Sequence, residues 1–307
     1  MVGRDPWEQG YPPTPGGLGD WFGHLAVAPS GEVLLTFNAA PNWRGTVQEP
    51  VGVGVAWRTP GHPFGPPRVL PGGPGGAVPQ FDARGTAYLS GYCNGFVLSA
   101  PPHSLNFARK LKITRKPVHD FTLSLSGAAH GLAAWTQEPC SFDAEGPGPP
   151  LGPVFASVLG SAFGAPLQLT PTATEASHAT AVALPAGGAV SWVTGGRQGV
   201  GVFSLPIGAD GLPGATQQLT DSFVPVSADA GGDQVFEPAP SAYGYPGGPV
   251  FVRPAGGGPD QAAPQPGGSA APAAETVAAA FGRAVAAAWS SSSAGAGTVM
   301  ALSVWRP

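Results

Sequence analysis

The chain has 307 residues and a formal net charge of −4; 42% of its residues are apolar and only 10% are charged. This weakly acidic balance excludes the broad basic surface of nucleic-acid-binding proteins, so we expect no nucleic-acid partner. No apolar stretch reaches the roughly 18 residues of a membrane-spanning helix, so no transmembrane segment is predicted. Gly (48) and Pro (38) are frequent, but the eight Trp recur with a period, which indicates turns between short strands rather than disorder.

A hairpin pattern recurs six times along the chain. Its clearest copy runs from His178 to Trp192: a short strand, a tight turn on Gly187-Gly188, and a returning strand that ends on a large aromatic residue. Further strands follow each hairpin, so that a complete unit has four. The boundaries of the units fall near 21–74, 75–116, 117–173, 174–221, 222–272 and 273–307.

The last two units depart from this pattern. In the fifth unit, residues 254–274 are rich in Ala, Gly, Pro and Gln without apolar periodicity, which predicts a disordered surface loop. In the sixth unit, the alanine-rich residues 271–289 leave a helix as an alternative, but Gly282 and the match to the other hairpins favour strands. This unit ends after three strands.

Repeats of four strands over about 40–50 residues are the signature of β-propeller blades. The sequence therefore predicts an all-β fold, a single domain that forms a six-bladed β-propeller of four-stranded antiparallel blades. Because the sixth unit supplies only three strands, we expect a strand from residues 6–15 to close the ring. The aromatic residues that end second strands are expected to pack between blades: Phe37, Trp135, Trp192, Phe236 and Trp289.

Units that read V-A-x-x-x-G-x-x-V-x-W, then V-x-V and F-G-x-P-x-x-L, resemble repeat proteins common in high-GC actinobacteria. These are uncharacterised β-propellers, often exported and sometimes described as sialidase-like, because six-bladed sialidases share the architecture. The resemblance covers residues 20–307 and implies a fold but no activity. Ser227-Ala-Asp229-Ala-Gly231 matches five positions of the sialidase Asp box, S-x-D-x-G-x-T-W, but Gly232-Asp233 replaces its Thr-Trp ending. No arginine triad, tyrosine or catalytic acid of that family transfers to a position here.

One set of polar residues falls just before, or at the start of, the expected innermost strand of nearly every blade. In a closed ring these residues would gather around one mouth of the central channel. They are Asp20, His24, Asp82, His119, Asp120, Glu175, His178, Asp221 and Glu275. Three interpretations stay open: solvent-exposed turn residues, a site for a polar ligand or a divalent cation, and acid–base catalysis. No other cofactor is expected.

Two further features bear on partners and compartment. The basic run Arg109 to Lys116 is typical of an edge strand whose lysines deter aggregation, with a site for an anionic surface polymer as the alternative. Cys93 and Cys140 follow second strands of neighbouring blades, which predicts a disulfide, with two free buried thiols as the alternative. A disulfide would favour an exported protein, although no signal peptide is visible after Met1.

These observations favour a non-catalytic binding or interaction propeller at the cell envelope or outside the cell, with a glycan or an envelope protein as its partner. We expect a monomer. The alternative function is a glycan-active enzyme, sialidase-like or another glycoside hydrolase or lyase, that uses carboxylates and histidines at the channel mouth. The alternative compartment is the cytoplasm.

Overall fold

The computed structural model describes residues 24–39, 52–74, 76–91, 95–116, 118–126, 130–137, 152–196, 199–219, 223–228, 232–238, 249–255, 258–262, 275–281, 284–293 and 297–305. In residues 275–305 only the backbone is described. None of the described residues is helical. Their strands form five four-stranded antiparallel sheets and one three-stranded sheet, each with its strands in chain order.

The first three sheets contain β1 (His24–Val27), β2 (Val33–Ala39), β3 (Gly52–Arg58) and β4 (Arg68–Pro71); β5 (Val78–Phe81), β6 (Ala87–Ser90), β7 (Phe96–Ala100) and β8 (Arg109–Lys112); and β9 (His119–Leu125), β10 (Gly131–Thr136), β11 (Val154–Leu159) and β12 (Leu167–Gln168). The last three contain β13 (Ala176–Leu184), β14 (Gly187–Gly196), β15 (Gly199–Ile207) and β16 (Gln217–Leu219); β17 (Phe223–Ala228), β18 (Gln234–Pro238), β19 (Phe251–Arg253) and β20 (Gln261–Ala262); and β21 (Glu275–Phe281), β22 (Ala284–Ser293) and β23 (Gly297–Trp305).

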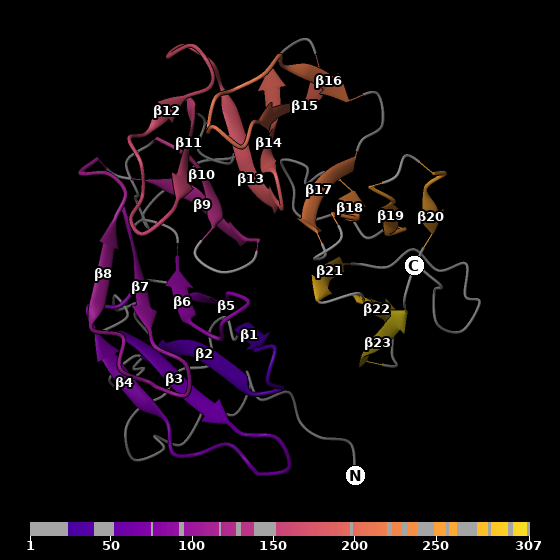
Figure 1. Cartoon of the computed structure of the whole chain (residues 1–307). Coiled ribbons are helices and arrows are strands. Elements are labelled where there is room, and N and C mark those ends of the chain that lie inside the picture. The colour runs from indigo at the N-terminus through magenta and orange to yellow at the C-terminus, as the bar shows by residue number, and fades with distance from the viewer. Residues whose placement is uncertain are drawn as a thin grey trace.

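The sheets follow one another around a common centre, and the first strand of each sheet lies innermost (Figure 1). The inner strands of consecutive sheets are neighbours along the series β1, β5, β9, β13, β17 and β21. Contact between the last sheet and the first, which would close a ring, is not shown by the described residues. In these residues, no helix has the length and hydropathy needed to cross a bilayer.

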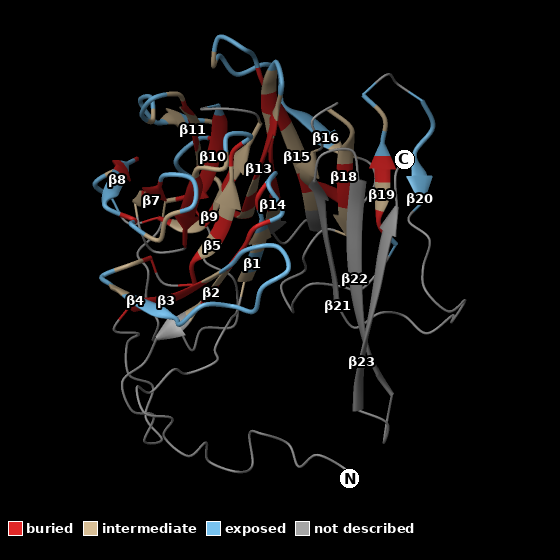
Figure 2. Cartoon of the chain, turned by 60° about the horizontal axis from the view of Figure 1, so that its bottom comes forward, coloured by how far each residue is buried: buried red, intermediate tan, exposed pale blue. Residues whose placement is uncertain are grey.

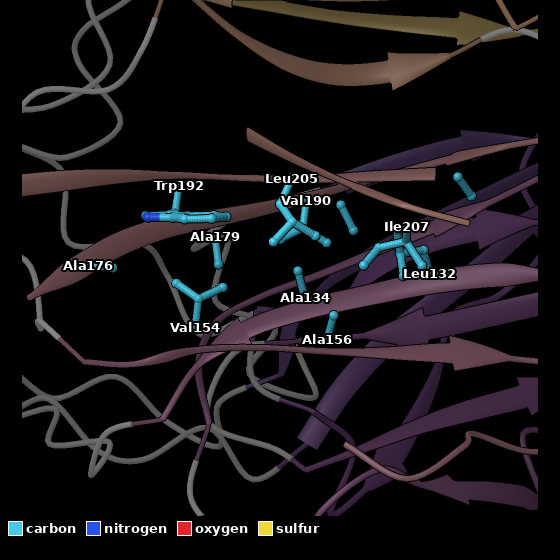
Figure 3. Packing of buried hydrophobic residues seen from close by; sticks show 12 residues of the cluster. Leu132, Ala134, Val154, Ala156, Ala176, Ala179, Val190, Trp192, Leu205 and Ile207 are labelled. Atoms are coloured by element: carbon cyan, nitrogen blue, oxygen red, sulfur yellow. The ribbon is translucent and has the colours of Figure 1, made fainter. Parts of the chain in front are cut away.

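The core consists of apolar layers between neighbouring sheets. One layer lies between sheets β9–β12 and β13–β16, where Trp192 is 3% exposed. Figure 3 shows Trp192 near Val154 at one end of this layer and Leu132 beside Ile207 at the other. Another joins sheets β5–β8 and β9–β12 around Trp135, which is 1% exposed. Exposed residues gather on outer strands such as β4, β16 and β20 (Figure 2). The prediction that these two tryptophans pack between sheets is confirmed.

Side chains of β9 also hydrogen bond to the backbone of β13, although the two strands belong to different sheets. Thr122, Ser124 and Ser126 alternate along β9 and the residue after it, so their hydroxyl groups point to one face. They bond to N–H and carbonyl groups of β13 at 2.9 to 3.1 Å, including the N–H groups of Ala181 and Ala183. This row of side-chain bonds fixes the two inner strands to each other.

Gly187 shows why the hairpin turns carry glycine. Its φ is +113°, in a region that L side chains rarely adopt, and a Cβ at this position would overlap the carbonyl oxygen of Ile207. The β13–β14 turn therefore needs glycine both for its backbone conformation and for the close approach of the neighbouring strand β15.

The alanine-rich segment and the expected loop can both be compared with the structure. Residues 275–281 and 284–293 are strands, so strands rather than a helix are confirmed there. The expectation of a disordered loop over all of 254–274 is wrong, because β20 lies within it and pairs with β19. Asp260 forms a 2.9 Å ion pair with Arg253 across this turn, which a composition argument does not detect. Residues 6–15 lie outside the described residues.

Candidate functional site

Three of the predicted site residues, His119, Asp120 and His178, come together where β9 and β13 begin. His119 and Asp120 are the first two residues of β9, and His178 is the third residue of β13. The Nδ1 atom of His119 lies 3.1 Å from Oδ1 of Asp120. The other carboxylate oxygen, Oδ2, accepts a hydrogen bond from the backbone N–H of His178 at 2.7 Å. The cluster therefore spans two sheets.

A bulge in β9 brings Asp120 to this position. Thr136 of β10 pairs with His119, and Ala134 pairs with Thr122, so two residues of β9 lie opposite the single residue Trp135. Asp120 has a φ of +46°, which is unusual for a residue with a side chain. A bulge of this kind re-aims a side chain that would otherwise follow the alternation of the strand.

The same irregularity recurs in β13. Val193 pairs with Ser177 and Ser191 pairs with Thr180, so His178 is the bulged residue, and its φ is +52°. Left-handed backbone at a non-glycine residue costs about 1–3 kcal/mol and persists where the surrounding structure enforces it. Neighbouring inner strands thus carry the same strained feature at corresponding positions, and both strained residues belong to the cluster.

The ionisation of Asp120 follows from its partners. Its side chain is 18% exposed, and burial alone would raise the pKa of the carboxyl group. The hydrogen bonds from the His119 ring and the His178 N–H outweigh burial, so the pKa lies below its usual value. Asp120 is therefore a carboxylate at neutral pH, with lone pairs left over for a further donor.

His178 is held in its neutral form. Burial lowers its pKa, the nearby carboxylate of Asp120 raises it, and His119 lowers it, with a net decrease. Its Nδ1 atom lies 2.9 Å from Oγ of Ser177. Ser177 is only 3% exposed and Asp120 contacts the backbone of His178 rather than its ring, so these three residues do not form a nucleophilic triad.

Thr136 is a further polar residue at the start of β9, where it lies opposite His119, and it was missed by the sequence analysis. It is fully buried, and among the described residues its hydroxyl group has no hydrogen-bond partner. It lies opposite His119 in the register of β9 and β10. Its counterpart in the first sheet, Thr36, lies opposite His24 and donates to the carbonyl oxygen of Ala77 at 2.5 Å. A buried hydroxyl without a partner is costly, which points to an additional polar group at this position.

Asp82 was predicted at the channel mouth, and that position is wrong. It follows β5 rather than preceding it, and it is 4% exposed. Oδ1 of Asp82 accepts hydrogen bonds from the N–H groups of Arg84 and Thr86 at 3.0 and 2.8 Å. Asp82 therefore stabilises the β5–β6 turn at the opposite end of the strand. The spacing Asp82-x-x-Gly85 is a turn signature that could have indicated this role.

The remaining predicted residues are placed as follows. His24 begins β1, and burial lowers its pKa. Glu175 is exposed, directly before β13. Asp20, Asp221, Cys93 and Cys140 lie outside the described residues, as does the side chain of Glu275. Within the described part of the chain, no group of three or more His, Cys, Asp or Glu side chains is arranged to hold a metal ion.

The partial Asp box begins with Ser227 and Ala228, the last two residues of β17, and its other residues, 229–231, lie outside the described residues. The next strand, β18, begins at Gln234, so the box lies at the connection between the first two strands of its sheet. The corresponding box of sialidases is expected between third and fourth strands.

No family model matches the chain, and no curated protein matches it in sequence. Several solved structures are similar in fold. The GH93 α-L-arabinofuranosidase of Fusarium graminearum in complex with arabinobiose has a TM-score of 0.54 and 12% identity, covering 93% of this chain and 92% of that one. A protein of unknown function from Dyadobacter fermentans has a TM-score of 0.51 and 12% identity, with 94% and 95% covered.

The acylaminoacyl peptidase of Pyrococcus horikoshii has a TM-score of 0.51 and 9% identity; the match covers 87% of this chain and 43% of that one. The arabinofuranosidase is a β-propeller protein, and this chain is likewise an all-β protein of the β-propeller type. At such identities the similarity concerns the fold alone.

Proposed function

We propose that this chain is a non-catalytic binding module for a neutral, hydroxyl-rich ligand such as a glycan unit, held where β9 and β13 begin. The observation that carries the proposal is the pair of left-handed residues, Asp120 and His178, at the same bulge position of neighbouring inner strands. Backbone strain of this kind clusters at ligand sites, because a site needs side chains in directions that a regular strand does not offer.

The chemistry of the cluster supports a hydroxyl-rich ligand. Asp120 offers an ionised acceptor, and the hydroxyl group of Thr136, which has no partner among the described residues, offers both a donor and an acceptor. Sugar hydroxyl groups donate and accept at once, so they match this mixture. The described cluster holds a single carboxylate and a buried serine, which supports binding rather than bond cleavage.

The test is calorimetric titration of the full chain with neutral disaccharides (cellobiose, maltose and arabinobiose), together with NMR of the histidine rings. We expect one of them to bind and to shift the His119 and His178 ring signals. Asp120→Asn should weaken binding at least tenfold, whereas Asp210→Asn, in an exposed turn, should not change it. Binding that is unaffected by Asp120→Asn, or unshifted ring signals with all three sugars, would contradict the proposal.

The alternative, a glycan-active enzyme, would need a second carboxylate about 5–9 Å from Asp120. The predicted acids that could supply it are Glu175, which is exposed directly before β13, and Asp20, Asp221 and Glu275, whose side chains lie outside the described residues. This alternative predicts turnover of 4-nitrophenyl glycosides that is abolished by Asp120→Ala. If the protein binds a sugar, loses that binding in Asp120→Asn and turns over none of these glycosides, the binding function stands.

We also propose that the ring has six blades and is closed. The side chains of β1 alternate between two faces. His24 pairs with Thr36, whose hydroxyl bonds to Ala77 of the second sheet, so His24 and Ala26 face that sheet. Leu25 and Val27 consequently face the other way, toward the place that a preceding blade would occupy.

The exposure of this second face supports closure. In β9, Phe121 and Leu123 face the preceding sheet and are 7% and 4% exposed. Leu25 and Val27, by contrast, are 58% and 52% exposed. We infer that sheet β21–β23, completed by a strand from residues 6–15, covers them. Deletion of residues 1–20 should then lower the melting temperature by several degrees, and an unchanged melting temperature would contradict closure.

The module is proposed to act as a monomer at the cell envelope or outside the cell, as in the exported repeat proteins that its units resemble. Glycans and envelope proteins are available to an exported module. A disulfide between Cys93 and Cys140, detected by mass spectrometry of the unreduced protein, would support this compartment, whereas two free thiols would favour the cytoplasm.

A further inference from the structure

We propose that the outer edge of the second sheet binds an anionic polysaccharide, at a site separate from the Asp120 cluster. The basic edge consists of β8 and the turn after it: Arg109, Lys110, Lys112, Arg115 and Lys116. It holds all the lysines of a chain whose net charge is −4. All five residues are exposed.

The cationic groups of the basic edge are not neutralised by the described part of the protein. The ion pairs of the described residues join His103 with Glu32, His119 with Asp120, and Arg253 with Asp260. Within the basic edge, Arg109 donates to the carbonyl oxygen of Ser161, and Nζ of Lys110 lies 3.5 Å from the ring centroid of Phe96.

The contacts of Arg109 with Ser161 and of Lys110 with Phe96 leave both side chains positively charged. A row of exposed cations without acids attracts a polyanion, and this attraction weakens with salt.

Protection against aggregation does not explain the basic edge. If lysines were placed to protect outer strands, the other outer strands would carry them too. The strands β4, β12, β16 and β20 contain one cationic residue between them, Arg68. The concentration of charge on β8 alone therefore indicates a specific local role.

The geometry of the basic edge selects the class of polyanion. Lys110 and Lys112 lie on one face of β8, about 6.7 Å apart along the strand. This linear row suits a single extended chain with carboxylate or sulfate groups. Single-stranded nucleic acid needs aromatic faces on which bases stack, and the face of Phe96 is already covered by Lys110. An anionic polysaccharide needs no such faces.

The test measures binding of the full chain to polygalacturonate and heparin at several salt concentrations. The variant Lys110→Gln/Lys112→Gln is compared with Arg68→Gln/Arg84→Gln, which removes the same charge from exposed positions elsewhere. We expect wild-type binding that weakens as salt rises, a loss of at least tenfold in the lysine variant, and less than a threefold change in the arginine variant.

Three outcomes would overturn the proposal: no binding of either polysaccharide at low salt, equal losses in the two variants, or tighter binding of oligo-dT than of both polysaccharides at the same salt concentration. Because all four substituted side chains are exposed, both variants should keep the melting temperature of the wild type, which is measured in parallel.

Discussion

Replacement of Asp120 by alanine tests whether the bulge in β9 is held by the carboxylate. The variant removes the acceptor of the His178 N–H, a charge-assisted hydrogen bond of 2.7 Å. Such a bond contributes about 1.5–3 kcal/mol. Alanine also tolerates the φ of +46° less well than aspartate does, which adds up to about 1 kcal/mol. We therefore expect Asp120→Ala to lower the free energy of unfolding by about 3 kcal/mol.

Asp120→Gly separates the two contributions, because glycine loses the same hydrogen bond but adopts positive φ without strain. It should be about 1 kcal/mol more stable than Asp120→Ala.

The assay is urea unfolding followed by tryptophan fluorescence, with the slope of the transition checked for two-state behaviour. Asp210→Ala is the control, because Asp210 accepts a backbone N–H at 3.0 Å in an exposed turn. If Asp120→Ala lies within about 0.5 kcal/mol of the wild type, or Asp120→Gly is the less stable of the two, the reasoning is refuted.

Other outcomes follow from the same geometry. The pKa of Asp120 in the folded protein lies below its usual 3.8. Its contribution to stability is therefore complete above pH 3.8 and is lost as the pH falls through the pKa of the folded protein. Asp120→Asn should flatten this loss, which is measured as the urea midpoint between pH 6 and 3. The pKa of His178 in the folded protein is also lowered, as is that of His24, so stability should decrease as the pH falls below 6.5. His178→Asn should reduce that slope, and the part that remains comes from His24. Gly187→Ala should cost about 2–4 kcal/mol of stability, because the new Cβ overlaps the carbonyl oxygen of Ile207 and the backbone is strained. Gly61→Ala, with φ +77° but open space around it, should cost only about 1 kcal/mol. Equal urea midpoints for the two variants would show that the overlap at Gly187 is relieved. Trp192→Ala should lower stability by about 3–5 kcal/mol in calorimetry, and a loss below about 1 kcal/mol would contradict its packing between sheets.

The strands and their order were accessible from the sequence because each hairpin carries its own signals. Glycine marks the turn, as at Gly187, and a large aromatic residue lies within the returning strand, as at Trp192 of β14. These signals are local, so they survive without knowledge of the neighbouring sheets. The short strand β20 was not accessible, since two residues carry no periodicity and its position depends on the edge of β19.

The candidate site was accessible only in part. His119, Asp120 and His178 were identified because polar residues stood at the start of expected inner strands. Asp82 was assigned to the wrong end of its strand: it follows β5 (Val78–Phe81), where its carboxylate accepts backbone N–H groups of the turn. The left-handed backbone of the bulges and the position of Thr136, whose hydroxyl has no partner among the described residues, depend on the register between strands, which no local pattern encodes.

The row of hydroxyl groups on β9 prevents the inner edge of β13 from pairing with another strand. The inner edge of β13 would otherwise present free N–H and carbonyl groups, which template the addition of a foreign strand. Thr122 and Ser124 occupy the N–H groups of Ala181 and Ala183, so this edge is already satisfied without being paired. Two blades can thus lie against each other at the axis without fusing into one continuous sheet, and these amide protons should exchange slowly with deuterated solvent although no partner strand covers them.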